Sequence, residues 1–345
     1  MSIKEIMKIY GVWNNKGGTG KTSIAFQVIC RYAQKNPSKR VLAIDMCPQA
    51  NLSELFLGGL QHGGSKNLLI QQGLTPRCSV GGYFQLRLPA PFAKPPFVAE
   101  DFLTQPSKYN STIPKNLSLF CGDPLLELQA NAINTLANTQ IPGTNTWVSV
   151  IDWLRDYLTA LKQPFDVIFI DANPSFSIYT QIALSSVERL LLPVMADDSS
   201  RRAIQNAFSL VYGLKLPSAI YSQYAFATKL TAAGRTLPRV HLIAKNRITQ
   251  YMGPASAYAA VLDSIDDDVA VLIKAQPELF TFNKVSNGMV EIRDFQTTGV
   301  VAFARGCPFY SMPTGRLDVG GQRVRVNESY RQNCVDAIDD MVAKL

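Results

Sequence analysis

The sequence predicts an α/β protein in which a doubly wound, mostly parallel sheet carries helices on both faces. Short apolar segments alternate with helical patterns along the 345 residues, and this order is typical of βαβ units with right-handed crossovers. One apolar segment runs into a glycine-rich loop, and two others end in an aspartate. Because the carboxyl ends of parallel strands share one edge of a sheet, these features are expected to line a single crevice. We therefore expect one domain over residues 1–345.

The apolar segments and the helical patterns define the expected elements. Strands are predicted near residues 6–13, 40–45, 117–121, 166–171, 189–194, 239–245 and 307–311. Helices are predicted near residues 21–35, 51–57, 123–138, 147–161, 176–187, 200–214, 254–275 and 328–344. Residues 58–115 interrupt this order with Gly-Gly pairs, among them 63–64 and 81–82, and with repeated prolines, which continue neither a helix nor a central strand. This segment is predicted to be an irregular insertion over the crevice.

Residues 14–22 read Asn-Asn-Lys-Gly-Gly-Thr-Gly-Lys-Thr and join a predicted strand directly to a predicted helix. Backbone N–H groups converge at such a turn, where the positive end of the helix dipole also favours a phosphate. Its three glycines let the backbone approach an anion closely. Lys21 can then reach the β- and γ-phosphates, and the Thr22 hydroxyl can bind Mg²⁺. The sequence predicts a phosphate-binding loop, and the alternative is a glycine-rich turn without function.

Two aspartates follow apolar strands elsewhere in the chain. Asp45 ends the segment 40–45, and Asp171 ends the segment 165–171. In a parallel sheet both carboxylates would face the crevice that holds the glycine loop, where they could hold metal-bound water. Taken singly, an aspartate after a strand is also a common helix or turn cap. The three segments together favour the functional interpretation.

These motifs resemble those of the ParA/MinD-type ATPases with a deviant Walker A motif, and among them the ParA-like plasmid and chromosome partition ATPases. The deviation is Asn15 at a position where the strict pattern has glycine, together with the additional lysine Lys16. The resemblance lies in residues 15–22, in Asp45-x-x-Pro-Gln-Ala-Asn and in residues 165–174, with weaker similarity at 191–194 and 246–247. It implies a P-loop NTPase fold, with ATP and Mg²⁺ as cofactors.

The resemblance also assigns roles to individual residues. The implied ATP-binding residues are Asn15, Lys16, Gly17, Gly18, Thr19, Gly20, Lys21, Thr22, Ser23 and Asn246. The implied catalytic residues are Lys16, Lys21, Asp45 and Asp171, and the implied metal ligands are Thr22, Asp45 and Asp171. Asn246 stands where family members recognise adenine, for which an amide offers a donor and an acceptor side by side. The alternative is that Asn246 forms a turn.

The family resemblance implies a homodimer that forms on ATP binding, with Lys16 reaching the phosphates of the partner subunit. Partition ATPases usually carry a second carboxylate two residues after the Asp45 position, and here that residue is Cys47. A largely neutral thiol does not replace an anionic acceptor, so hydrolysis is expected to be slow and to need a partner protein; the alternative is a switch locked in the ATP-bound state. That partner would be a centromere- or cargo-binding adaptor.

The chain carries a net charge of +8, and the positive charge is concentrated in one segment. Residues 199–262 contain eight lysines and arginines and no acidic residue, which favours a polyanion such as DNA. The candidate DNA-binding residues are Arg201, Arg202, Lys229, Arg235 and Arg247. A solvated surface is the alternative.

The expected function is an ATP-dependent partition ATPase that binds nonspecific DNA and moves or positions DNA cargo. The alternative is an ATP-dependent scaffold that positions a protein cargo with little catalysis.

Several other classes of protein are not expected. No apolar run approaches the length of a membrane helix, and the acidic C-terminal helix does not resemble the basic membrane anchor of MinD-like proteins. The six scattered cysteines suggest neither zinc ligands nor disulfides, and they lack the pattern of an iron–sulfur reductase. No helix-turn-helix pattern precedes the first strand, so operator binding is not expected. A cytoplasmic, nucleoid-associated protein is predicted.

Overall fold

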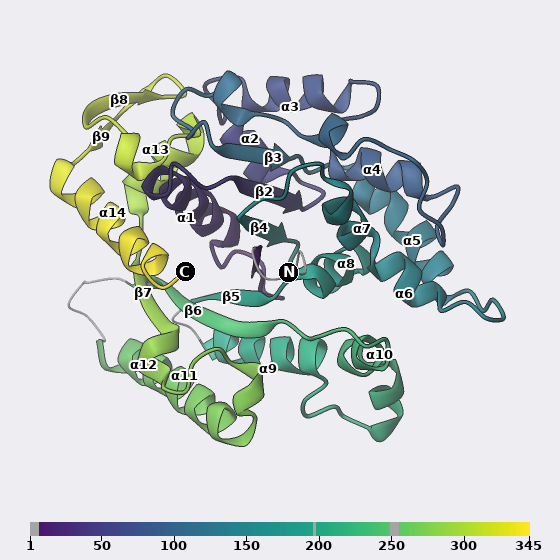
Figure 1. Cartoon of the computed structure of the whole chain (residues 1–345). Coiled ribbons are helices and arrows are strands. Elements are labelled where there is room, and N and C mark those ends of the chain that lie inside the picture. The colour runs from purple at the N-terminus through teal and green to yellow at the C-terminus, as the bar shows by residue number, and fades with distance from the viewer. Residues whose placement is uncertain (1–6, 196–197, 249–254) are drawn as a thin grey trace.

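The computed structural model describes residues 7–195, 198–248 and 255–345, with the backbone alone at 198–201, 247–248 and 255–262. A seven-stranded sheet with the order β3-β2-β4-β1-β5-β6-β7 forms its centre (Figure 1). The strands are β1 Lys8–Val12, β2 Val41–Met46, β3 Leu117–Phe120, β4 Val167–Ala172, β5 Arg189–Met195, β6 Arg239–Ile248 and β7 Met289–Arg293. Neighbouring strands pair in parallel throughout. The predicted doubly wound α/β class is confirmed.

Helices cover both faces of the sheet and separate most of its strands along the chain (Figure 1). The described helices are α1 Lys21–Lys35, α2 Asn51–Phe56, α3 Gly64–Gln72, α4 Val80–Arg87, α5 Leu125–Asn138, α6 Thr146–Ile151, α7 Trp153–Ala160, α8 Ile178–Ser186, α9 Asp198–Tyr212, α10 Phe226–Ala232, α11 Ala255–Ala275, α12 Val285–Gly288, α13 Gln296–Arg305 and α14 Glu328–Val342. Within the described part of the chain, none of these helices combines the length and the apolar character that a transmembrane segment requires.

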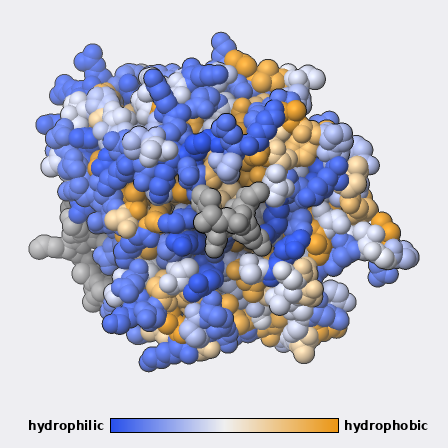
Figure 2. All heavy atoms as spheres, in the orientation of Figure 1, coloured by the Kyte–Doolittle hydropathy of each residue, from blue (hydrophilic) through white to orange (hydrophobic). Residues whose placement is uncertain are grey.

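The side chains of the central strands alternate between two hydrophobic cores. Ile9 and Trp13 point into a core formed with α4 to α11, whereas Tyr10 and Val12 point into a core formed with α1, α2, α13 and α14. Strands β2 and β4 are buried along their whole length because helices cover both of their faces. The outer surface differs, since hydrophilic residues cover most of the face shown in Figure 2.

The prediction of a strand at residues 307–311 is wrong. A short 3₁₀ helix, Phe309–Ser311, lies there, and the Phe309 ring packs against Phe295 with 4.7 Å between the ring centroids. The apolar run therefore reflects a buried aromatic contact, and Pro308 lacks the N–H that a strand residue would donate. The seventh strand is β7, whose residues alternate between buried and exposed. An antiparallel hairpin of β8 Gly315–Val319 and β9 Gln322–Val326 was also not predicted.

Residues 58–115 are more regular than predicted, because they contain α3, α4 and two 3₁₀ helices, Ala99–Phe102 and Pro106–Lys108. The Gly-Gly pair at 81–82 lies inside α4, which begins where the Ser79 hydroxyl accepts a hydrogen bond from the Gly82 N–H at 3.0 Å. A Cβ atom on Gly82 would lie 2.0 Å from the Arg77 carbonyl oxygen. These glycines therefore serve close packing and not an irregular loop.

Candidate functional site

The glycine-rich loop leaves the carboxyl end of β1 and is fixed there by two buried side chains. The Trp13 indole N–H donates to the Asn173 carbonyl at 2.8 Å, and the Asn14 amide donates to the Pro193 carbonyl at 2.8 Å. The Asn14 side-chain oxygen also accepts the Lys16 N–H at 3.0 Å. The loop is thereby tied to the ends of β4 and β5. Asn14 directly precedes the motif, but nothing in its sequence context indicates this role.

The glycines give the loop its shape and leave space beside it. Gly18 and Gly20 have φ angles of 73° and 80°, in the left-handed region that glycine adopts without steric cost. Cβ atoms built on Gly17 or Gly18 meet no atom within 4 Å. Among the described residues no side chain caps α1, so the first N–H groups of this helix are available to a ligand at the loop. This arrangement fits an anion at the positive end of the helix.

Lys21 lies at the start of α1 and is 7% exposed. Its Nζ donates to the Lys16 carbonyl at 2.7 Å, which places the ammonium group under the loop. Burial lowers the pKa of Lys21, while the nearby Asp171 carboxylate acts in the opposite direction. A buried ammonium group beside open backbone space is suited to bind a phosphate.

Asp171 and Thr22 form the part of the site that best fits a metal ion. The Thr22 hydroxyl donates to Asp171 Oδ2 at 2.9 Å, whereas Asp171 Oδ1 is buried without a hydrogen-bond partner in the described protein. Burial, and secondarily Asp45, raise the pKa of Asp171 to about 7. A buried carboxylate oxygen without a donor, next to a hydroxyl, is suited to bind Mg²⁺.

Asp45 lies beside Asp171 in the sheet but has different partners. Its Oδ2 accepts the Ser53 N–H at 2.9 Å and the Ser53 hydroxyl at 2.8 Å, and its Oδ1 accepts the Cys47 N–H at 3.1 Å. Burial raises the pKa of Asp45 to about 6, and the hydrogen bonds from Ser53 oppose this shift. The capping alternative therefore describes Asp45 in this structure, since it binds the first turn of α2. Ser53 was not identified from the sequence.

Cys47 directly follows β2, is partly exposed and lies close enough to both carboxylates to feel their charge. Its thiol donates to Gln49 Oε1 at 2.9 Å. Burial, followed by the charges of Asp45 and Asp171, raises the pKa of Cys47 to about 12. The thiol is neutral at physiological pH and is not an anionic acceptor.

A family model described as an AAA domain matches residues 7–216. The chain belongs to this family, the ParA/MinD-like ATPases. No curated protein matches the chain at a significant level.

Solved structures of ParA/MinD-like proteins share the fold over almost the whole chain. A variant of McdA from Cyanothece in complex with ATP has a TM-score of 0.61 at 14% identity, covering 98% of this chain and 96% of McdA. Apo McdA from Cyanothece has a TM-score of 0.57 at 16% identity, covering 88% and 91%. A putative plasmid partition protein from Borrelia burgdorferi B31, bound to AMPPNP, has a TM-score of 0.53 at 15% identity, covering 98% of each chain.

Asn246, for which the ParA/MinD-like resemblance implies adenine recognition, lies in β6 and is 3% exposed. The turn-forming alternative is wrong because the residue is in a strand. Its amide nitrogen donates to the Thr19 carbonyl at 2.9 Å, and a Cβ atom on Gly20 would lie 2.2 Å from that nitrogen. Asn246 therefore supports the loop backbone, and adenine recognition stays a prediction.

The remaining predicted ligand residues line the same loop. The side-chain oxygens of Asn15 and Thr19 are buried without a partner in the described structure. Lys16 is partly exposed, and Ser23 is partly exposed in the first turn of α1. The structure thus brings the predicted loop residues, Asp45, Asp171 and Asn246 to one edge of the sheet.

Three of the predicted DNA-binding residues, Lys229, Arg202 and Arg235, have described side chains, and Lys229 and Arg235 contact other parts of the fold. Arg235 pairs with Asp152, and Lys229 lies 4.5 Å from the centroid of the Trp147 ring. Arg202 is exposed on α9. The side chains of Arg201 and Arg247 lie outside the described residues.

Lys245, in the same segment, is 4% exposed and pairs with Asp266 at 2.7 Å. The count along the sequence missed Asp152 and Asp266 because both lie outside residues 199–262.

Proposed function

We propose that this chain is an ATP- and Mg²⁺-dependent ATPase that pairs with a second copy of itself when ATP is bound. One observation carries the proposal: Lys21, Thr22 and the unpaired Oδ1 of Asp171 converge beside a glycine loop with open space next to its backbone. Two solved relatives in the fold comparison hold ATP or AMPPNP. A Mg²⁺-nucleotide requires the groups that meet here: an ammonium group for its phosphates, and a hydroxyl and a carboxylate for its metal ion.

Each residue has a distinct role under this proposal. Lys21 binds the β- and γ-phosphates of its own nucleotide, and Lys16 extends to the nucleotide of the second subunit. Thr22 and Asp171 hold Mg²⁺, which would neutralise charge on the phosphate oxygens. Asp45 orients the loop that carries Cys47, through its bonds to Ser53 and to the Cys47 N–H. Asn246 holds the loop backbone in position through its hydrogen bond to the Thr19 carbonyl.

Slow hydrolysis follows from the neutral Cys47 thiol. The thiol donates its one hydrogen bond to Gln49. Because its pKa is raised, the thiol stays protonated and can neither accept a proton nor orient water as a carboxylate would. An adaptor protein that reorganises this loop would then raise turnover. We propose that such an adaptor binds a centromere or another cargo.

Nonspecific DNA is the proposed surface on which the dimer acts. Arg202 on α9 is the described candidate whose side chain is exposed, and a dimer presents it twice. Each additional phosphate contact strengthens binding through counterion release. The chain would then be cytoplasmic and associated with the nucleoid.

The second candidate is an ATP-dependent scaffold for a protein cargo that does not depend on DNA. Arg235 pairs with Asp152, and Lys245 pairs with Asp266. Because these ion pairs within the fold reduce the positive charge that DNA would meet, they favour the scaffold. Titration of nonspecific DNA with ATP, with ADP and without nucleotide, at two salt concentrations, separates the two. DNA binding that needs ATP and weakens with salt supports partition, and no binding in any state supports the scaffold.

Light scattering coupled to size-exclusion chromatography tests the dimer. The protein is expected to be monomeric without nucleotide and dimeric with ATP and Mg²⁺. Lys16→Ala is expected to bind ATP but to stay monomeric, while Lys66→Ala, an exposed lysine on α3, serves as the matched control and should dimerise. An ATP-bound dimer of the Lys16→Ala variant as stable as that of the control would refute the role of Lys16.

A further inference from the structure

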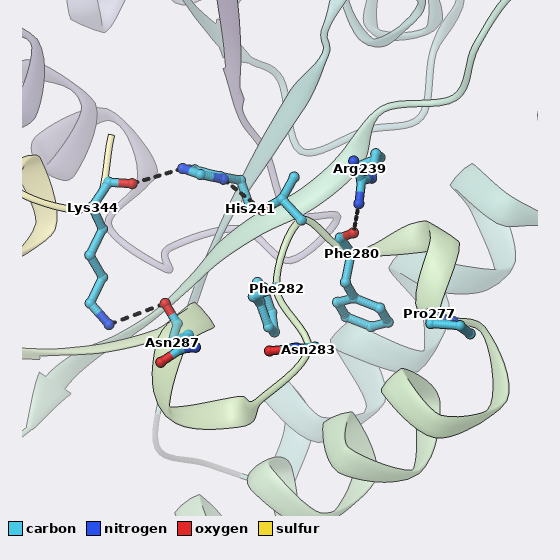
Figure 3. A pocket seen from close by; sticks show the side chains of 9 residues that line it. Arg239, His241, Pro277, Phe280, Phe282, Asn283, Asn287 and Lys344 are labelled. Atoms are coloured by element: carbon cyan, nitrogen blue, oxygen red, sulfur yellow. Dashed lines mark hydrogen bonds between the residues drawn. The ribbon is translucent and has the colours of Figure 1, made fainter.

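A second cavity, of about 480 Å³, lies at the amino end of β6, at the edge of the sheet opposite the glycine loop (Figure 3). Its lining comes from Arg239 and His241 at the start of β6, from the segment 277–283, from Asn287 and from Lys344 after α14. This volume is within the range of small-molecule sites, roughly 300–1,000 Å³. None of the residues assigned to the nucleotide site contributes to it.

The cavity wall is built into the fold and does not depend on a ligand. The segment 277–283 continues alongside β6, since the Thr281 N–H donates to the Val240 carbonyl at 3.0 Å. The Phe280 and Phe282 rings pack together with 5.3 Å between their centroids. A Cβ atom on Gly288 would lie 2.1 Å from the Phe282 ring, so the glycine lets this ring seat against α12. The aromatic side of the cavity is therefore held in place.

The polar side of the cavity has a defined hydrogen-bonding state. His241 Nε2 lies 2.8 Å from the Lys344 carbonyl oxygen, which only accepts, so Nε2 carries the proton. His241 Nδ1 then accepts from the Thr281 hydroxyl at 2.7 Å. Burial lowers the pKa of His241, and positive neighbours add to this shift. The neutral imidazole thus links β6 to Thr281 and to the Lys344 carbonyl on two sides of the cavity.

Among the described residues that line the cavity, Arg239 and Lys344 carry positive charge and none is acidic. The neighbours that disfavour a charged His241 are Arg189, Lys8 and Arg239, which all lie at the amino ends of strands. The Lys344 ammonium is bound to backbone carbonyls, at 2.8 Å from that of Met289. Arg239 donates one N–H to the Phe280 carbonyl, and its exposed side chain carries further N–H donors. A negatively charged group is favoured there.

We propose that this cavity binds a small organic anion whose carboxylate or phosphate pairs with Arg239 and whose apolar body lies against Phe282 and Pro277. In Figure 3, Phe282 and Asn283 lie between the Arg239 side and the Lys344 side of the cavity. The exposed amides of Asn283 and Asn287 provide donors and acceptors at the rim. An oxyanion gains from a planar guanidinium donor, and an apolar body gains from a fixed aromatic ring.

The test is calorimetric titration with benzoate, phenyl phosphate and the neutral benzyl alcohol. Because a phosphate also fits the glycine loop, each titration is repeated with the Lys21→Ala variant, in which the loop lysine is removed. At least one of the two anions is expected to bind both proteins in the millimolar range or tighter, and benzyl alcohol at least about tenfold more weakly. The tighter of the two anions identifies the preferred oxyanion.

Variants of the lining decide whether this cavity is the site. Arg239→Gln keeps an amide donor for the Phe280 carbonyl and is expected to weaken anion binding about tenfold or more. Phe282→Leu and Asn283→Ala, the latter at an exposed side chain, should weaken it by smaller factors even if Arg239→Gln folds poorly. Arg316→Gln, an exposed arginine on β8, is the matched control and should bind as the unaltered protein does.

Three results would overturn the proposal. They are no binding of either anion at millimolar concentrations, binding that all three cavity variants retain, and binding that disappears in Lys21→Ala.

Discussion

Ser53→Ala should destabilise the protein, because Ser53 is a buried hydrogen-bond partner of the predicted metal ligand Asp45. Its hydroxyl donates to Asp45 Oδ2 at 2.8 Å and accepts the Gly122 N–H at 2.9 Å, and Ser53 is fully buried. The variant loses a hydrogen bond to a carboxylate and leaves the Gly122 N–H without its acceptor. Each loss costs about 1–3 kcal/mol, so the free energy of unfolding should fall by about 3 kcal/mol.

Urea unfolding followed by circular dichroism measures this change at a fixed pH. Ser286→Ala, at an exposed serine of α12, is the control and should shift the unfolding free energy by less than about 0.5 kcal/mol. Because Ser53 also holds Asp45, the Ser53→Ala variant should hydrolyse ATP more slowly than the control. A loss of stability no larger than that of Ser286→Ala would refute the argument that Ser53 links Asp45 to the Gly122 turn.

Three further predictions concern the glycine loop, the Cys47 thiol and a half-buried lysine. Gly20→Ala should lower both stability and ATP affinity, because its Cβ would lie 2.2 Å from the Asn246 amide. At Gly17 a Cβ would meet no described atom within 4 Å. Gly17→Ala should therefore lower ATP affinity and leave the free energy of unfolding in urea unchanged. Cys47→Asp should increase steady-state ATP hydrolysis, and unchanged turnover would count against the role assigned to the thiol. Burial lowers the pKa of Lys229 to about 8 in the folded protein, below its value of 10.5 in the unfolded chain, so stability should rise from pH 8 to about pH 10. This rise should be absent in Lys229→Met, and equal pH profiles of the two proteins would contradict it.

The position of the glycine-rich loop between β1 and α1 could be predicted from the sequence because its signal is local. A strand, three glycines, a lysine and a threonine follow one another within residues 8–22, and the fold then determines where they lie. Asp45 and Asp171 were predictable for the same reason, since each ends an apolar strand and the strands are neighbours in the sheet. Their different hydrogen-bond partners were not predictable, because Ser53 and Thr22 reach them only in three dimensions.

What the sequence left unpredicted shares one cause, which is that burial and charge pairing depend on contacts between distant segments. Residues 307–311 are apolar because Phe309 fills a core, and not because they form a strand. The segment 199–262 is basic by count, yet Asp152 and Asp266 come from outside it to pair with Arg235 and Lys245. The cavity at the amino end of β6 combines residues that are about one hundred positions apart, and therefore no local pattern indicated it.

The two aspartates at the carboxyl edge of the sheet divide their tasks through their partners. Asp45 accepts three hydrogen bonds from protein donors, so a ligand at its carboxylate would compete with Ser53 and with the Cys47 N–H. Asp171 accepts one, from Thr22, and its second oxygen is unpaired among the described residues. A cation can therefore join Asp171 without breaking a bond to that oxygen. We therefore expect Asp171 to bind the metal ion and Asp45 to position the loop, although both aspartates end the same kind of strand.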